Sequence, residues 1–554
     1  MNLLGGEGNI VTALENQART QPAFPALVEP KISGLRRTSR AVTFSELFDH
    51  ATILAKGLAH HGFAPGDRVA VFVPPSIESF ALIFGLFRLG ATPVMIDPGL
   101  GIRGMGHCLE EAKPSGFLGI AKAQIARLLL GWGKSTIKRS VQVGPTVPWA
   151  GASYNEVFRA GVRERTSDLP KGGYSRSDAP PAAILFTSGS TGPAKGVVYS
   201  HSHFFSQLRL LGGHFHLGPG DIDIPTFPLF GLFGPALGMR EVIPVMDFTR
   251  PAQVDPVMLT DLVKNHKATS LFGSPALLRR LCSFAVPWGV RLETLGRIVS
   301  AGAPVPFDIV ARVKTLLASG ADVHTPYGAT EALPVASISG SEILGGTREG
   351  TEQGMGVCVG RPMPEMDVRI LKISDGPMPN FGERDLALPG EVGEIAVAGP
   401  VVTREYFGRP DLTGLHKSKG PDGKMYHRMG DLGHVDGRGR LWMCGRKSQR
   451  VETAQGPLFT EAIEGIFTGL EGVRRTALVG LGAQGSKTPV LWVEPEENVS
   501  WEELLPRVRT RAQGHPMASR ITTFLPEPAF PVDIRHNSKI QREVLAKRAG
   551  GLVP

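Results

Sequence analysis

Paired cysteines, long hydrophobic runs and blocks of like charge are all missing from this 554-residue chain. Its four cysteines stand far apart with no CxxC pair, which argues against a disulfide framework and against a structural zinc site. The best apolar run, Phe80–Phe87, is stopped by Arg88 and falls short of the ~18 residues that cross a membrane. The first residues also lack the basic segment and apolar core of a signal peptide. We therefore expect a cytoplasmic protein without a transmembrane segment.

Charge is unbalanced but not clustered. The chain carries 60 lysines and arginines against 51 aspartates and glutamates, a formal net charge of +9. No block of about five like charges predicts a nucleic-acid-binding tail, so we expect no nucleic-acid partner. With 42% hydrophobic and 20% charged residues the composition is that of a globular protein, and the length predicts at least two domains.

Short apolar runs alternate with helical patterns through the first two-thirds of the chain. Predicted strands include Val69–Val73, Thr92–Ile96 and Pro181–Phe186, and Ser202–Leu211 has a helical pattern. Strands that alternate with helices predict parallel sheets with helices on both faces. We expect an α/β large N-terminal domain with parallel-containing sheets flanked by helices.

The last hundred or so residues have a different character. After a turn-rich stretch, amphipathic helical patterns and short strands follow, enough for a small α+β domain. We expect residues 1–446 to form the large domain, 447–449 to be a hinge, and 450–554 to form a small, mobile C-terminal domain.

The most informative stretch is Leu185–Gly196, which reads LFTSGSTGPAKG. Glycine N–H groups and hydroxyls can ring a phosphate, and Lys195 adds a positive charge. The P-loop of nucleotide triphosphatases does not fit, because Ala194 and Gly196 stand where that motif needs a glycine and a hydroxyl. The predicted nucleotide-binding residues are Thr187, Ser188, Gly189, Ser190, Thr191, Gly192 and Lys195.

Four further segments follow in order along the chain. They are Ser300–Pro304 (SAGAP), Tyr327–Glu331 (YGATE), Tyr426–Asp431 (YHRMGD) with Gly445-Arg446, and Asn537–Arg542 (NSKIQR). Together with the phosphate loop they resemble the adenylate-forming superfamily of acyl-CoA synthetases, peptide-synthetase adenylation domains and beetle luciferases. The resemblance covers nearly the whole chain. It implies ATP and Mg²⁺ as cofactors, with a carboxylic acid converted to an acyl-adenylate and pyrophosphate released.

The resemblance also implies roles for single residues. The ring of Tyr327 would stack on adenine, Thr330 would reach the α-phosphate, and Glu331 would bind Mg²⁺. The loop containing Gly302 would lie along the adenine. These roles suit the chemistry, because an aromatic face packs against a flat base and a hard carboxylate suits a hard cation.

Three more positions come from the second half of the chain. By resemblance, Asp431 would accept hydrogen bonds from both ribose hydroxyls, and Arg446 would lie near ribose and phosphate. Lys539 would enter the active site during adenylation and stabilise the charge that builds on carboxylate and pyrophosphate. Ser538 replaces the glycine of the family's segment, while Lys539 and Arg542 keep their spacing.

The segment after the domain boundary departs from the family pattern. Ser448 stands at the hinge position, which is usually Asp or Lys. In acyl-CoA synthetases a glycine turn beyond the hinge admits the pantetheine arm of CoA, and here Gln455 stands at that place. A side chain there would obstruct the tunnel, although Gly456 could serve under a shift of one residue.

A second departure lies in Phe227–Gly234 (FPLFGLFG), where many relatives place a histidine at the position of Gly231. The change leaves an aromatic and aliphatic acyl pocket. Its predicted members are Phe227, Phe230, Gly231, Leu232 and Phe233. A purely structural role in the core is the alternative for the phenylalanines.

Over its whole length the chain looks most like the β-lactone synthetases of bacterial long-chain olefin biosynthesis. This resemblance implies a 2-alkyl-3-hydroxy fatty acid as substrate, whose own β-hydroxyl attacks the activated carbonyl and expels AMP. Because the hydroxyl is tethered, no second substrate is needed. His201 and His203 are candidates for the base that removes the hydroxyl proton, and a structural role is their alternative.

The resemblance further implies an assembly with partner enzymes of the olefin pathway. A long-chain fatty acyl-CoA ligase that forms AMP is the alternative function, and transfer to a carrier protein is a third.

Overall fold

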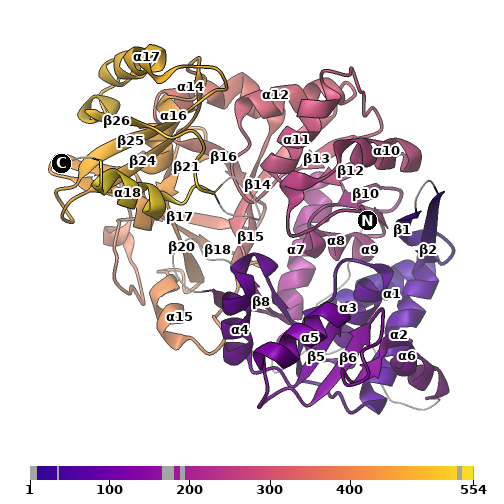
Figure 1. Ribbon diagram of the computed structural model, residues 1–554. Helices are drawn as coiled ribbons and strands as arrows, with labels where there is room; N and C mark the ends of the chain where they lie inside the picture. Colours follow the sequence, from indigo (N-terminus) through magenta and orange to yellow (C-terminus); the bar gives the residue numbers. More distant parts are fainter. Residues whose placement is uncertain (1–8, 34–35, 165–179, 188–193, 533–538, 553–554) are drawn as a thin grey trace.

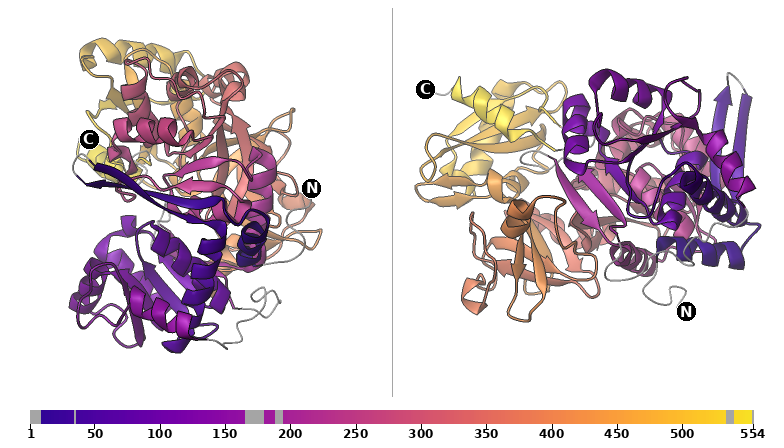
Figure 2. Two further views of the ribbon diagram at one scale, coloured as in Figure 1. Left: turned by 90° about the vertical axis from the view of Figure 1, so that its right-hand side faces the viewer. Right: turned by 90° about the horizontal axis from the view of Figure 1, so that it is seen from below.

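The computed structural model describes residues 9–33, 36–164, 180–187, 194–532 and 539–552. Its strands form a seven-stranded sheet, a fourteen-stranded sheet, a three-stranded sheet and a two-stranded hairpin. The seven-stranded sheet and the C-terminal residues lie at opposite sides of the molecule, with the middle of the chain between and beside them (Figure 1). Two further views show the same separation (Figure 2).

The seven-stranded sheet has the strand order β7-β6-β5-β3-β4-β8-β9, and all its neighbours run parallel except β8 and β9. Its strands are β3 (Arg68–Phe72), β4 (Thr92–Ile96), β5 (Gly116–Ile120), β6 (Arg139–Val143), β7 (Ala152–Ser153), β8 (Ala183–Thr187) and β9 (Lys195–Tyr199). Strand β8 is buried over most of its length, as its unbroken apolar sequence predicts.

The fourteen-stranded sheet is parallel in one half and antiparallel in the other. Parallel pairs join β11, β10, β12, β13 and β14, and the antiparallel half begins where β14 turns into β15. Its strands are β1 (Pro25–Ser33), β2 (Arg36–Thr43), β10 (Ile222–Pro225), β11 (Arg240–Val242), β12 (Ser270–Phe272), β13 (Arg297–Val299), β14 (Asp322–Ala329), β15 (Ala332–Ser339), β16 (Val357–Pro362), β17 (Asp367–Leu371), β18 (Gly393–Ala398), β19 (Lys417–Lys419), β20 (Met425–Val435) and β21 (Leu441–Arg446).

Helices connect and cover these strands. Most have a capping residue that the sequence supplies; Ser76, for example, accepts a hydrogen bond from the N–H of Ser79 at the start of α3. The helices up to β21 are α1 (Ile10–Thr20), α2 (Phe44–His60), α3 (Ile77–Leu89), α4 (Gly101–Ala112), α5 (Ala121–Leu130), α6 (Tyr154–Arg163), α7 (His201–Phe215), α8 (Pro228–Gly231), α9 (Phe233–Leu237), α10 (Pro256–His266), α11 (Pro275–Ala285), α12 (Phe307–Leu316), α13 (Gly340–Glu342), α14 (Arg348–Glu352) and α15 (Pro410–His416).

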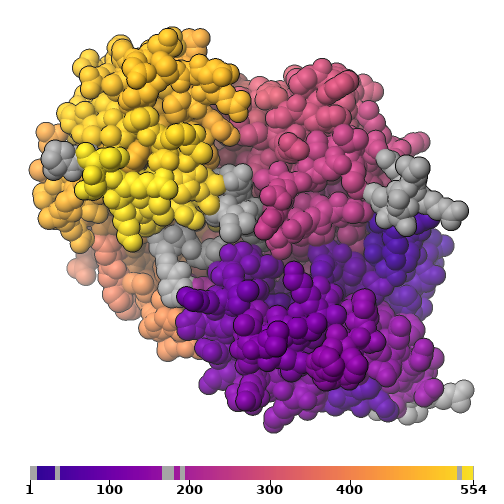
Figure 3. Space-filling model, viewed as in Figure 1, coloured from indigo at the N-terminus to yellow at the C-terminus, as the bar shows by residue number. Residues whose placement is uncertain are grey.

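Beyond β21 the chain builds a separate small sheet with its own apolar core. Its elements are β22 (Val451–Thr453), β23 (Gly456–Leu458), α16 (Thr460–Ile466), β24 (Val473–Leu481), β25 (Thr488–Pro495), α17 (Trp501–Gln513), β26 (Thr523–Pro526) and α18 (Arg542–Gly550). Residues 447–449, the predicted hinge, form a single turn between β21 and β22. Figure 3 shows these C-terminal residues, in yellow, on one side of the front face. Rotation about the turn stays a prediction.

The α/β class and the main elements agree with the sequence expectation, because long apolar runs and helical periodicity specify them. The antiparallel half of the large sheet was not predicted in detail. Its strands are partly polar, so they lack the continuous apolar runs that mark β3, β4 and β8.

A buried ion pair stabilises this antiparallel half. Arg428 on β20 donates from Nη2 to Oε2 of Glu394 on β18 at 2.6 Å, and both side chains are 1% exposed. The same guanidinium donates to the carbonyl oxygens of Ser374, Gly376 and Leu415. One arginine thereby ties the loop 374–376 and α15 to the sheet that carries the cavity wall.

We predict that Arg428→Met lowers the free energy of unfolding by about 3 kcal/mol or more, because it leaves a buried carboxylate and three carbonyls without this donor. Urea denaturation followed by circular dichroism measures the effect. Arg361→Met is the control: its pair with Glu342 is 58% and 50% exposed, so the change is expected to stay below ~1 kcal/mol. Equal losses in the two variants would contradict the prediction.

Candidate active site

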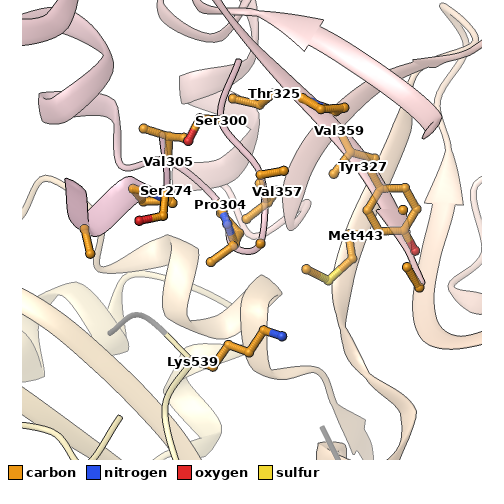
Figure 4. A pocket seen from close by; sticks show the side chains of 18 of the residues that line it. Ser274, Ser300, Pro304, Val305, Thr325, Tyr327, Val357, Val359, Met443 and Lys539 are labelled. Carbon is orange, nitrogen blue, oxygen red and sulfur yellow. The ribbon is translucent and has the colours of Figure 1, made fainter. Parts of the chain in front are cut away.

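One cavity of about 1540 Å³ lies where the two large sheets and the C-terminal residues meet. Its wall includes the loop 300–306, the β14–β15 turn, the middle of β20, part of β21, and residues 539–543. Figure 4 shows Lys539 extending into this space below Pro304 and Met443, with Tyr327 on β14 farther away. The cavity therefore gathers most of the predicted site residues that the structure describes.

Asp431 anchors the nucleotide end of the cavity. Its carboxylate is 3% exposed, accepts a hydrogen bond from the Tyr327 hydroxyl at 2.7 Å, and pairs with Arg446 Nη1 at 2.8 Å. Burial raises the pKa of Asp431, and the charges of Arg446 and Lys539 oppose that rise. The family resemblance implies that Asp431 accepts hydrogen bonds from the ribose hydroxyls. Its carboxylate already accepts from two donors and still has oxygen lone pairs for the hydroxyls.

Thr330 and Glu331 lie in the tight turn between β14 and β15. The Thr330 hydroxyl is 3.0 Å from the hydroxyl of Thr187, which ends β8 in the other large sheet. The backbone carbonyl of Glu331 accepts from the N–H of Thr403 at 2.8 Å, and its carboxylate Oε1 accepts from the hydroxyl of Tyr406 at 2.6 Å. Both side chains are thus aimed by hydrogen bonds to separate elements.

The predicted phosphate loop is described only at its two ends. Thr187 and Lys195 line the cavity and are directly opposite one another in the β8–β9 pair. Residues 188–192, named as nucleotide-binding from the sequence, lie outside the described residues. Gly302, in the predicted adenine loop, lines the cavity with φ near +99°, a backbone conformation that favours glycine.

Lys539 is held at the cavity by its neighbour in the sequence. Arg542 donates to Glu464 at 2.6 and 3.1 Å and to Glu461 at 3.3 Å, both on α16. It also donates to the side-chain oxygen of Gln449 in the hinge turn at 3.2 Å. Arg542 therefore fixes the start of α18, three residues after Lys539, to α16 and to the hinge.

The predicted acyl pocket is largely assembled, with one correction. Phe227, Phe230, Leu232 and Phe233 line the cavity, and the ring of Phe230 stacks on that of Phe272 at 4.3 Å between centroids. Gly231 does not line it; a Cβ there would lie 3.0 Å from Pro225 and 3.3 Å from Phe80. Helix α8 presents Phe230 to the cavity. Gly231 lies on the side of α8 that packs closely against Pro225 and Phe80, where there is little room for a side chain.

The histidines that follow the phosphate loop are not in the cavity wall. Nδ1 of His203 accepts from the Ser200 N–H at 3.0 Å, while Ser200 Oγ accepts from the His203 N–H, so His203 caps the start of α7. His201 packs edge-on against Phe87. Neither lines the cavity in the part of the chain that the structure describes. The structure places His203 in the helix cap, the structural alternative of the sequence analysis, and a role as base stays a prediction.

Gln455 lies in the turn between β22 and β23, is exposed, and does not line the cavity in this arrangement. Its predicted obstruction of a pantetheine tunnel concerns the rotated arrangement and stays a prediction. Ser448 in the hinge turn does line the cavity.

Sequence reasoning missed three residues of one segment, Tyr406, His416 and Lys417. Tyr406 and His416 line the cavity, and Nε2 of His416 lies 3.1 Å from Nζ of Lys195. Lys417 is 6% exposed and donates to the carbonyl of Thr403, and burial lowers its pKa to about 7. None of the three belongs to a quoted motif, so no local signal in the sequence marked them.

A family model for AMP-binding enzymes matches residues 14–407. The chain belongs to this family. It is 47% identical over 547 residues to the olefin beta-lactone synthetase of Stenotrophomonas maltophilia, covering 97% of each chain, and 46% identical over 551 residues to that of Xanthomonas campestris, again covering 97% of each.

Solved structures share the fold of this AMP-binding enzyme. The O-succinylbenzoate coenzyme A synthetase of Bacillus subtilis, in complex with ATP and magnesium ion, has a TM-score of 0.73 at 20% identity, covering 96% of this chain and 98% of that one. None of the helices that the structure describes meets the length and hydropathy of a membrane span.

Burial lowers the pKa of His201, His203 and His416 to about 4, and that of His427 well below its usual value. The unfolded chain takes up protons on these residues near pH ~6.5, whereas the folded enzyme does not. We predict that these histidines contribute a fall in the free energy of unfolding as pH drops from about 7 toward about 4, by up to ~1.4 kcal/mol per pH unit for each histidine. The buried carboxyl groups of Asp223, Glu241 and Glu464, whose pKa values burial raises, contribute with the opposite sign.

Urea midpoints between about pH 7.5 and pH 5 measure this slope. His201→Gln is expected to make it shallower, while His107→Gln, at a side chain 83% exposed, leaves it unchanged. A slope that His201→Gln leaves unchanged would show that the pKa of His201 is not lowered in the folded enzyme.

Proposed function

We propose that this chain activates a 2-alkyl-3-hydroxy fatty acid with ATP and then closes it to a β-lactone. In the first step a carboxylate oxygen of the acid bonds to the α-phosphorus of ATP, and pyrophosphate leaves. In the second the β-hydroxyl oxygen bonds to the acyl carbon, the bond from that carbon to the phosphate oxygen breaks, and AMP and a proton are released. The observation that carries the proposal is the near-full-length identity of 47% to an enzyme named for this product.

The residues present suit the nucleotide. Asp431, paired with Arg446, offers carboxylate oxygens to ribose hydroxyls, and Thr330 offers a hydroxyl to a phosphate beside it. Lys195 and Lys539 bring two cations to the same cavity. The two lysines would hold the reacting groups in place and neutralise the charge that builds up on the leaving pyrophosphate.

Glu331 is the residue that suits Mg²⁺. The described residues contain no cluster of three or more metal-binding side chains, and Mg²⁺ is commonly held by one or two carboxylates together with substrate phosphates. A carboxylate steadied by the Tyr406 hydroxyl at the phosphate end of the cavity fits that donor set. When bound, Mg²⁺ would neutralise phosphate charge during the displacement.

The cavity also suits a bulky acid with two alkyl chains. Its volume of about 1540 Å³ exceeds the ~300–1,000 Å³ of common ligand sites. Beyond the phenylalanines of α8 and α9, apolar residues from α1, α3 and α7 line it, as do residues that follow β11. They are Ile10, Phe87, Phe204, Phe248, Pro251 and Ala252. Cytoplasmic location and docking with partner enzymes of an olefin pathway stay predictions.

Product analysis tests the proposal directly. Purified protein is incubated with Mg·ATP and a 2-alkyl-3-hydroxy fatty acid, with and without CoA, and products are identified by NMR and mass spectrometry. We expect a four-membered cyclic ester and AMP in equal amounts, with no dependence on CoA. A thioester that forms only with CoA would instead establish an acyl-CoA ligase, and the matched acid without its 3-hydroxyl serves as control for ring closure.

We predict that Lys539→Ala lowers the rate of acid-dependent pyrophosphate release by about 100-fold or more, because a preorganised charge at the reacting phosphate is lost. A coupled pyrophosphate assay measures it. Lys547→Ala, at an exposed position of α18, is the control and is expected to be unchanged within about twofold. Unaltered release in Lys539→Ala would remove this lysine from the reaction.

A further inference from the structure

Lys195 has a partner outside the adenylation motifs. Its Nζ lies 3.1 Å from Nε2 of His416, the last residue of α15. The same Nζ lies 5.4 Å from the centre of the Tyr406 ring, on whose face a cation is attracted. Two side chains of one segment therefore hold the ammonium group that enters the cavity from β9.

The hydrogen-bonding state of His416 follows from its surroundings. Burial, with the adjacent charge of Lys195, lowers the pKa of His416 to about 4, so the ring is neutral near pH ~7. An ammonium group has donors and no acceptor, so Nε2 of the neutral ring accepts and Lys195 donates at this contact.

The backbone around this contact is also fixed. Residues 405–407 extend β9 on its open edge: Phe407 N–H donates to Gly196 at 2.7 Å, and Val198 N–H donates to Glu405 at 3.3 Å. The hydroxyl of Thr413 in α15 accepts from the Tyr406 N–H at 3.1 Å. Strand β9, Tyr406 and α15 are thereby connected directly, and the distance between Lys195 and His416 is set by backbone hydrogen bonds.

We propose that His416 is a positioning residue for adenylation, which accepts a hydrogen bond from Lys195 and aims its ammonium at the phosphates of ATP. Tyr406 completes the arrangement, because its ring faces Lys195 while its hydroxyl holds Glu331 at 2.6 Å. The inference rests on the proposed function, since it assigns the role of His416 within that reaction. Without the acceptor, the four-carbon side chain of Lys195 can adopt several rotamers, and its ammonium group is no longer held in one position.

A double-mutant cycle tests the proposal. The variants are His416→Leu, which removes the acceptor at similar volume, His416→Gln, which restores an acceptor oxygen, Lys195→Ala, and Lys195→Ala with His416→Leu. We expect His416→Leu to lower kcat for acid-dependent pyrophosphate exchange by about 10- to 100-fold, with KM for ATP changed less than about threefold, because the charge remains but is misplaced. His416→Gln should recover most of the loss.

Coupling distinguishes positioning from a general structural effect. In the Lys195→Ala background, His416→Leu should change the rate by less than about twofold, because its target is already absent. His434→Leu is the matched control: His434 is a buried histidine bonded to the Met355 carbonyl at 3.1 Å and does not line the cavity. Its effect should be the same in the wild-type background and in the Lys195→Ala background.

Equal effects of His416→Leu in both backgrounds, or no recovery in His416→Gln, would overturn the proposal. The same cycle is read in the Kd for ATP by calorimetry, which requires no turnover, and there we expect a coupling of the two changes no larger than about threefold, in line with the small change in KM. If the wild-type enzyme gave no exchange with any acid, the proposed function would fail, while calorimetry would still decide whether His416 acts through Lys195.

Discussion

Residues 402–407 are the physical link on which the site depends, because they pair with both large sheets at once. Val402 is bridged to Ala332 at the start of β15, and Tyr406 is bridged to Val197 in β9. The two sheets bring different charges to the cavity, Lys195 from β9 and Glu331 from the turn before β15. One short segment thereby connects the strand that carries Lys195 with the turn that carries Glu331.

Two of the charged groups at this end of the cavity are held by neutral partners rather than by direct pairing. Asp431 is paired with Arg446, yet Glu331 is steadied by a neutral hydroxyl and Lys195 by a neutral imidazole. A neutral partner aims a charged group without cancelling it, so the charge stays available to a substrate. A charge that its partner does not cancel acts on a phosphate more strongly than a charge that is already paired.

The site residues that lie in short sequence motifs could be predicted, whereas those that distant segments bring to the cavity could not. Thr330, Glu331, Asp431 and Lys539 could be named because each lies in a compact pattern, and the structure brings all four to one cavity. Tyr406 and His416 could not, since their role arises from pairing of residues 405–407 with β9, which no local pattern encodes. His203 and Gly231 were misplaced for a related reason: a helix cap and a close packing contact decided where each lies.

The distribution of polar groups bears on how a ring could close here. The charged residues named above gather at the nucleotide end, while phenylalanines and aliphatic residues form the wall on the acyl side. With His201 and His203 outside the wall, ring closure in this pocket would depend on the tether between hydroxyl and carbonyl. Intramolecular nucleophiles gain a large rate advantage when well oriented, and in this reaction that advantage offsets part of the strain of a four-membered ring. An apolar wall that holds two alkyl chains would supply that orientation. Because the nucleophile is part of the substrate, the reaction depends more on the shape of this pocket than on a second binding site.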